Sequence, residues 1–267
     1  MPTLWTRMRA ELGDGDAQYQ LAESLRLADV ASAVPWYRRA ARQGHVAAQT
    51  MLAFLLANGI GVPPDPRRAI AWYRRAAAKG DVGAQNNLGW MHEQGAGVPC
   101  NPAKAALWYR LAALQHSATA QVNLALLLLD GRGVERDDAE AVRWLRAAAA
   151  QGHPAAQMRL GLCLREGVGT DRDPDEAARW LHAAALRGDP EAKEALSELR
   201  GGGAHGSGTG GGEPDMLEDE AEGMDHRHQA DLLGEGDMMM PHSAMGAAMG
   251  AAMGAGGGQG GAAPRLQ

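Results

Sequence analysis

The sequence predicts an all-α fold, a solenoid of about five helix–turn–helix repeats that is followed by a disordered tail. One tryptophan recurs every 36 residues, with an alanine three positions before it and an alanine pair four and five positions after it. The tryptophans of this series are Trp36, Trp72, Trp108, Trp144 and Trp180. A fixed period of this length is typical of supersecondary units that stack on one another in an array.

The period divides the chain into a lead-in, an array and a tail. The predicted parts are the lead-in 1–13, the array 14–200 with repeats 14–44, 45–80, 81–116, 117–152 and 153–188 and a capping helix at 189–200, and the tail 201–267. The final helix has no partner helix, so we expect its polar face to cover the end of the core.

The lead-in and the first repeat differ from the rest of the array. The lead-in should form a short helix over the first repeat, because its apolar residues have helical spacing. Those residues are Leu4, Trp5, Met8 and Leu12. The first repeat lacks the Gly-x-Gly-Val turn of its neighbours. If Ser32 is the N-cap of its second helix, Pro35 falls near the helix start, where proline is tolerated.

The second repeat shows how each pair of helices is delimited. Its first helix should run from about 46 to 58 and end at Gly59, since glycine accepts the left-handed conformation that closes a last turn. Asp65 is a suitable N-cap and Pro66 a suitable first residue for a second helix over about 66–79.

The same helix boundaries recur along the array. The expected N-caps of the later second helices are Asn101, Asp137 and Asp173, and those of the later first helices are Asp81, Ser117, His153 and Asp189. A glycine ends most second helices, and His116 replaces it once. Small residues at fixed positions let helix axes approach closely, and we expect the five periodic tryptophans to fill the space between them as core residues.

Composition and charge limit the classes of partner. The chain carries a net charge of −6, and the tail alone carries −8, which leaves +2 on residues 1–200. No part has the basic excess of a nucleic-acid-binding domain. No apolar run approaches the roughly 20 residues of a membrane span, and the amino terminus lacks the apolar region of a secretory signal. With only Cys100 and Cys163, a disulfide framework is not expected, which favours a reducing compartment. We predict a cytoplasmic protein, and we expect it to be a monomer.

The repeat resembles a known family in its alanines, its glycine turn and its Trp-Tyr pair. The pattern is clearest at Ala84, Leu88, Gly89, Gly95, Gly97, Val98, Ala105, Trp108, Tyr109, Ala112 and Ala113. It is similar to the Sel1-like repeat, a relative of the tetratricopeptide repeat, over residues 14–200. The resemblance implies a right-handed α/α superhelix whose first helices line a concave surface, and a role as an adaptor or scaffold for other proteins.

Candidate binding residues are first-helix positions that the repeat pattern does not require. Related tetratricopeptide domains clamp peptide carboxylates with asparagine and basic residues, which makes Asn86, Asn87, Asn123 and Arg159 candidates here. Their amides and guanidinium can bind a peptide backbone or a carboxylate. Trp90 lies outside the 36-residue series and is a candidate aromatic anchor, with packing between repeats as the alternative.

The tail offers two alternative functions. Asp215 and Glu218 have the spacing of a capping box, and an apolar helical stripe that includes Leu217 follows. Two interpretations remain open: an acidic helix that forms on binding, and a solvated acidic linker. Such a segment could bind a basic partner or occupy the groove of the repeats. The Met/His-rich stretch from Met238 onward has ligands that suit Cu(I), and a low-complexity tail without metal is the favoured alternative.

Catalytic signals are absent from the sequence. The G-x-G-x-x-G match at 206–211 follows no predicted strand and opens no helix, so we reject it as a dinucleotide site. No nucleophile–base pair and no H-E-x-x-H motif occurs. We therefore predict a non-enzymatic protein that binds a protein or peptide, with no catalytic residue, metal or cofactor.

Overall fold

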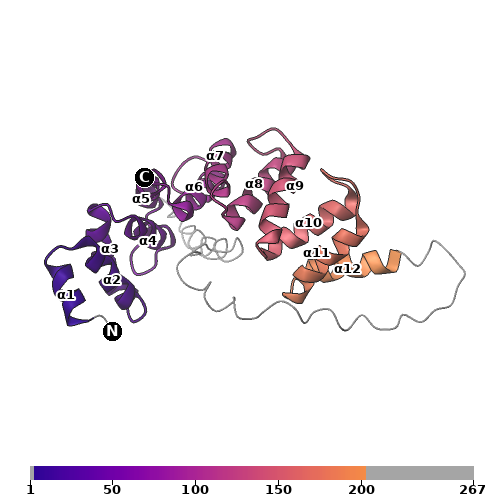
Figure 1. Ribbon diagram of the computed structural model, residues 1–267. Helices are drawn as coiled ribbons and strands as arrows, with labels where there is room; N and C mark the ends of the chain where they lie inside the picture. The colour runs from indigo at the N-terminus through magenta and orange to yellow at the C-terminus, as the bar shows by residue number, and fades with distance from the viewer. Residues whose placement is uncertain (1–2, 203–267) are drawn as a thin grey trace, which may run out of the picture. The chain divides into compact units, whose positions relative to one another are not determined.

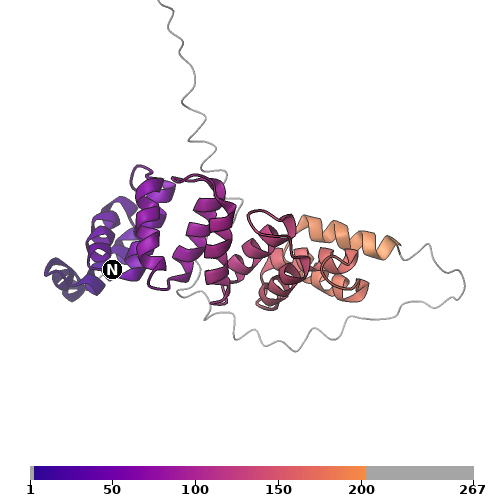
Figure 2. The same ribbon diagram turned by 90° about the horizontal axis from the view of Figure 1, so that it is seen from above.

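The computed structural model describes residues 3–202, which form twelve helices and no strand. Short turns connect the successive helices (Figure 1, Figure 2). The helices are α1 (Leu4–Glu11), α2 (Gly15–Arg26), α3 (Val30–Arg42), α4 (Val46–Asn58), α5 (Pro66–Ala77), α6 (Val82–Gln94), α7 (Pro102–Ala113), α8 (Ala118–Asp130), α9 (Asp138–Ala150), α10 (Pro154–Glu166), α11 (Pro174–Leu186) and α12 (Pro190–Gly202). The predicted all-α, helix–turn–helix class is confirmed. The predicted tail lies outside the described residues.

The described helices belong to two compact units. The N-terminal unit comprises residues 3–100 with α1 to α6, and the C-terminal unit comprises residues 101–202 with α7 to α12. In the N-terminal unit α2 pairs with α3 and α4 with α5, while α1 packs on α2 and α6 on α5. In the C-terminal unit α8 pairs with α9 and α10 with α11, while α7 packs on α8 and α12 on α11.

From α5 onward the helices begin at the N-cap residues that the sequence predicts, and one of these residues does not cap through its side chain. The side chains of Asp65, Asn101, Asp137 and Asp173 each accept a hydrogen bond of 2.7–3.0 Å from the backbone N–H three residues ahead. Asp81, Ser117 and Asp189 do the same for the first helices. His153 is also an N-cap residue, but its side chain makes no capping hydrogen bond. The local sequence therefore determines most helix boundaries.

The first repeat starts its second helix earlier than predicted. Helix α3 begins at Val30, because Asp29 is its N-cap and accepts a 3.0 Å hydrogen bond from the N–H of Ala31. Ser32 lies inside the first turn and its hydroxyl also bonds to Asp29. Pro35 is therefore inside the helix rather than at its start. The lead-in forms α1 as predicted, but it contacts the first repeat through Ala10 while its larger apolar residues are exposed.

The periodic tryptophans are not core residues, and that prediction was wrong. All five are half-buried, whereas the residue after each of them is fully buried. Those buried residues are Tyr37, Tyr73, Tyr109, Leu145 and Leu181. The reason is helical geometry. In α5, for example, Tyr73 shares a helix face with Ala69 and Ala77, and Trp72 is rotated off that face.

The second glycine of each Gly-x-Gly turn lies against the start of an earlier helix. Gly97, Gly133 and Gly169 all have φ between 68° and 74°, and a Cβ added to any of them would overlap the first residues of the preceding second helix. His116 occupies a position where other repeats have glycine, and its φ is 65°. The recurring glycines thus mark both a left-handed conformation and a close approach of two backbones.

Candidate functional site

The five predicted binding residues lie on first helices of both units. Asn86, Asn87 and Trp90 are on α6 in the N-terminal unit, where they are 5%, 5% and 8% exposed. Asn123, on α8 of the C-terminal unit, is 4% exposed, and Arg159 on α10 is exposed. Of these five, only Arg159 presents its side chain to solvent.

Asn87 has a structural contact that sequence reasoning did not identify. Its Nδ2 donates a 3.2 Å hydrogen bond to the hydroxyl of Tyr73 on α5. Tyr73 is fully buried, and burial raises the pKa of its phenol far above its usual range, which keeps the hydroxyl neutral. Asn87 therefore connects α6 to α5 inside the core.

A row of large apolar side chains follows one position of the first helices. Phe54, Trp90, Leu126 and Leu162 are separated by 36 residues each, and all except Trp90 are half-buried. On α10, Leu162 comes one helical turn after the exposed Arg159. Leu162 also packs against the core cluster that contains Met158 and Leu181. An accessible cation and a partly accessible leucine thus lie side by side on one rigid helix.

A second row on the first helices consists of buried glutamines. Their Nε2 atoms donate hydrogen bonds of 3.0–3.4 Å to alanine carbonyls near the end of the preceding second helix. The glutamines are Gln49, Gln85, Gln121 and Gln157, and their acceptors are Ala41, Ala77, Ala113 and Ala149. Each of these carbonyls also accepts a backbone hydrogen bond of 2.9–3.1 Å from the residue three positions ahead. The glutamine therefore uses the second lone pair of the carbonyl, and its own buried amide gains a partner. The exact 36-residue recurrence of a polar residue was the signal that sequence reasoning missed.

The second helices of the C-terminal unit are connected by ion pairs. Arg110 of α7 donates to Glu140 of α9 at 2.5 Å, and Arg146 of α9 donates to Glu176 of α11. Each of these carboxylates also accepts a 3.1 Å hydrogen bond from an indole N–H, that of Trp144 for Glu140 and that of Trp180 for Glu176. The arginine hydrogen bond is the main reason that the pKa of Glu140 and of Glu176 lies below its usual range, and the indole contributes.

These pairs predict a loss of stability in acid. A carboxylate whose pKa is lower in the folded state stabilises the fold above its unfolded pKa of about 4.3, and this contribution is lost as the pH falls through the folded value. The double variant Glu140→Gln/Glu176→Gln should have a lower urea midpoint than wild type near neutral pH, and the difference should shrink below about pH 4. Glu135→Gln, at an exposed carboxylate of the same unit, is the control. A difference that does not change with pH would contradict the prediction.

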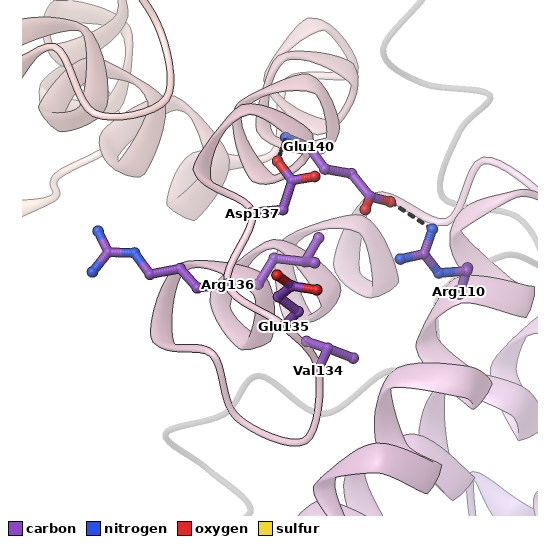
Figure 3. Close-up of a pocket in the computed structure, with 7 residues that line it drawn as sticks. Arg110, Val134, Glu135, Arg136, Asp137 and Glu140 are labelled. Atoms are coloured by element: carbon purple, nitrogen blue, oxygen red, sulfur yellow. Dashed lines mark hydrogen bonds and ion pairs between the residues drawn. The ribbon is translucent and has the colours of Figure 1, made fainter.

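A shallow pocket of about 430 Å³ opens at the turn between α8 and α9 (Figure 3). It is lined by Arg110, Leu128, Val134, Glu135, Arg136, Asp137 and Glu140. Its two cations are paired, Arg110 with Glu140 and Arg136 with Asp138 at 2.8 Å. Asp137 caps α9, so its carboxylate also has a structural partner. Because both cations and Asp137 already have partners in the fold, the chemistry of this pocket does not point to a ligand.

Residues 3–202 contain no group of three or more His, Cys, Asp or Glu residues arranged to hold a metal ion. Within the same residues no helix is both long and apolar enough to cross a membrane. Cys100 is exposed and Cys163 is buried, and burial raises the pKa of the Cys163 thiol, which makes it a weak nucleophile. The predicted Met/His-rich copper stretch and the acidic segment of the tail lie outside the described residues.

The repeats match a known protein family. The Sel1 repeat family matches residues 15–45, 46–81, 82–117, 118–153 and 154–189. A search of curated proteins found no match. Among solved structures, a protective antigen of uropathogenic Escherichia coli strains that displays an SLR fold is 30% identical, with a TM-score of 0.73 over 76% of this chain and 44% of its own. This chain therefore spans less than half the length of that antigen. A Sel1 repeat protein from Oxalobacter formigenes is 29% identical, with a TM-score of 0.65 over 73% of this chain and 79% of its own.

Proposed function

Because the chain belongs to the Sel1 repeat family, whose members typically mediate protein interactions and are usually non-catalytic, we propose that it is a non-enzymatic scaffold. In this proposal its first helices bind a protein or peptide partner. The observation that carries the proposal is the exposed guanidinium of Arg159 beside the partly exposed Leu162 on α10. Among the described residues, Arg159 has no carboxylate partner, so its charge remains available.

The chemistry of this pair favours a particular kind of peptide. A guanidinium binds a carboxylate with two parallel hydrogen bonds, and a neighbouring leucine offers an apolar contact. The partner would therefore present an acidic side chain or a terminal carboxylate next to an apolar residue. Asn123 belongs to the same unit as Arg159 and remains a supporting candidate there, whereas Asn86, Asn87 and Trp90 are separate candidates within the N-terminal unit. A partner reaches any of these four residues only if covering side chains move.

The test is a comparison of two arginine variants of the full chain. Arg159→Ala removes the proposed contact, and Arg143→Ala removes an exposed arginine from the second helix α9 of the same unit. We expect quantitative capture from a native lysate to show proteins that wild type and Arg143→Ala retain and Arg159→Ala loses, by about tenfold if the contact contributes about 1.4 kcal/mol. Equal capture by both variants would reject the surface around Arg159.

The proposed compartment is the cytoplasm. Cys100 carries an exposed free thiol, which a reducing compartment preserves. The two cysteines lie in different units and neither forms a disulfide with another described residue.

A further inference from the structure

The second helices of the two units carry different charges at equivalent positions. In the C-terminal unit, Glu140 on α9 and Glu176 on α11 each accept a hydrogen bond from an arginine of the preceding second helix. The arginine that pairs with Glu140 is Arg110, and its equivalent two repeats earlier is Arg38 on α3. The equivalent of Glu140 two repeats earlier is Arg68 on α5, so the N-terminal unit has a cation where the C-terminal unit has the carboxylate.

The backbone around this position is the same in both units. Helix α3 begins at Val30 and α7 at Pro102, two repeats later, and the N-caps of α5 and α9 are Asp65 and Asp137, again two repeats apart. Helix α4 packs on both α3 and α5, as α8 packs on both α7 and α9. No residue is inserted or lost between these helices, so positions 38 and 68 are related in space as positions 110 and 140 are.

The hydrogen-bond donors of the paired site are also present in the N-terminal unit. The carboxylate of Glu140 accepts from Arg110 at 2.5 Å and from the indole N–H of Trp144 at 3.1 Å. Arg38 and Trp72 hold the equivalent positions, and within the described part of the chain neither donates to a carboxylate. Arg38 is exposed and Trp72 is half-buried, so solvent reaches both residues. A pair of carboxylate donors is therefore present without its carboxylate.

Cations lie one helical turn before and one turn after Trp72 on α5. The Nε of Arg68 pairs with Asp65 at 3.1 Å, and Asp65 also caps the helix, so this carboxylate has structural partners. The guanidinium of Arg75 stacks 4.5 Å from the ring centre of Trp72, which leaves the N–H groups at its edge available. Helices α3 and α5 together carry seven arginines and no acidic residue. Negative charge at this site must therefore come from outside these two helices.

Helix stability does not explain the cation at position 68. Arg68 lies in the first turn of α5, where the helix dipole favours an acidic residue and opposes a cation. Glu140 and Glu176 hold this position in α9 and α11, as the dipole favours. The exposed pair of Arg68 with Asp65 contributes little to stability, since surface ion pairs are typically weak. A residue that breaks a local rule in this way indicates a functional role.

We propose that Arg38 and Trp72 bind an aspartate or glutamate side chain of a partner protein. The guanidinium of Arg38 and the indole N–H of Trp72 donate to its carboxylate, which occupies the place that Glu140 holds in the C-terminal unit. The ligand is a carboxylate rather than a phosphate, because the same pair of donors binds a carboxylate twice in this chain, at Glu140 and at Glu176.

The surroundings of the site indicate what kind of segment carries the carboxylate. Further exposed arginines lie on the same two helices, and among the described residues none of them pairs with a carboxylate: Arg39, Arg42, Arg74 and Arg75. None of the large exposed apolar residues of the N-terminal unit lies on α3 or α5, so this surface offers no residue for insertion into a membrane. The partner is therefore a protein segment with several acidic residues. The site lies on second helices, so its failure would leave the proposed function of Arg159 untouched.

The test follows the indole N–H signals of the full chain by NMR during titration with acetylated hexaglutamate at low salt. The Trp72 signal, identified by its loss in Trp72→Phe, should shift, whereas those of Trp144 and Trp180 should not, because their N–H groups already bind glutamates. Arg38→Gln should weaken the affinity about tenfold, through the loss of one charge-assisted hydrogen bond. Arg67→Gln, at another exposed arginine of α5, should weaken it much less.

A second pair of variants supplies the carboxylate from within the chain. Arg68→Glu places it where the C-terminal unit has Glu140, so it should abolish the hexaglutamate shift of Trp72 and raise the urea midpoint of unfolding. Arg68→Gln removes the same cation without adding a carboxylate and should keep the shift. Equal results for these two variants would overturn the proposal, as would equal weakening by Arg38→Gln and Arg67→Gln. So would the absence of a Trp72 shift, or a larger shift with inorganic phosphate or an RNA oligonucleotide than with hexaglutamate.

Discussion

Replacing Tyr73 by alanine should lower the free energy of unfolding by about 3–5 kcal/mol, the range for truncating a large buried aromatic residue. Tyr73 is fully buried, and its hydroxyl accepts the hydrogen bond from Asn87. The alanine would leave a cavity between α5 and α6 and a buried amide without its acceptor. Tyr73→Phe keeps the ring and should cost only about 1 kcal/mol, the typical net value of one hydrogen bond.

The neighbouring residue provides the control. Trp72→Ala removes the larger side chain, but Trp72 is half-buried and stacks with Arg75 at the surface. We expect it to cost about 1–2 kcal/mol, from partial loss of apolar burial and of the cation–π contact. Urea unfolding followed by far-ultraviolet circular dichroism measures both variants without relying on tryptophan emission. A larger loss for Trp72→Ala than for Tyr73→Ala would show that the tryptophan series, and not the residue after it, carries the core.

This pair of residues shows how far the sequence predicts the fold. The 36-residue period and the caps such as Asp65 and Asn101 act locally, so the class, the helix order and most boundaries follow from the sequence. The period does not say which residue of the Trp-Tyr pair faces the core, because adjacent helical positions differ by about 100°. Periodicity alone therefore favours the recurring tryptophan as the core residue, whereas the residue after it fills the core.

The exposure of first-helix residues was harder to predict than the fold, for a related reason. Exposure of a first-helix residue depends on the helices on both sides of it, and these contacts are not local in sequence. Asn87 has a core partner on α5, and Trp90 is covered to 8% exposure, whereas Arg159 is exposed. Residues that the repeat pattern does not require can thus still be needed for packing in a single repeat.

Gly133→Ala is expected to be the second large destabilisation, at about 2–5 kcal/mol. Gly133 has φ of 72°, and a Cβ there would overlap the backbone of Pro102 and Ala103 at the start of α7. An alanine in the left-handed region costs about 1–2 kcal/mol, and overpacking against a fixed backbone adds about 1–3 kcal/mol. Urea unfolding of the full chain gives the difference from wild type.

Gly131→Ala separates the two contributions within the same turn. Gly131 has φ of 63°, but its Cβ would meet only Arg136, at 3.4 Å from the side-chain Cβ and 3.7 Å from the backbone nitrogen, which are ordinary contacts. Only the left-handed cost of about 1–2 kcal/mol should remain. If the two variants lost equal stability, Gly133 would be needed only for its left-handed backbone conformation and not for the close approach to α7. If Gly133→Ala loses more, as we expect, the glycine is needed because the turn after α8 rests on the first residues of α7, and the spacing of the glycines then records the contact between successive repeats.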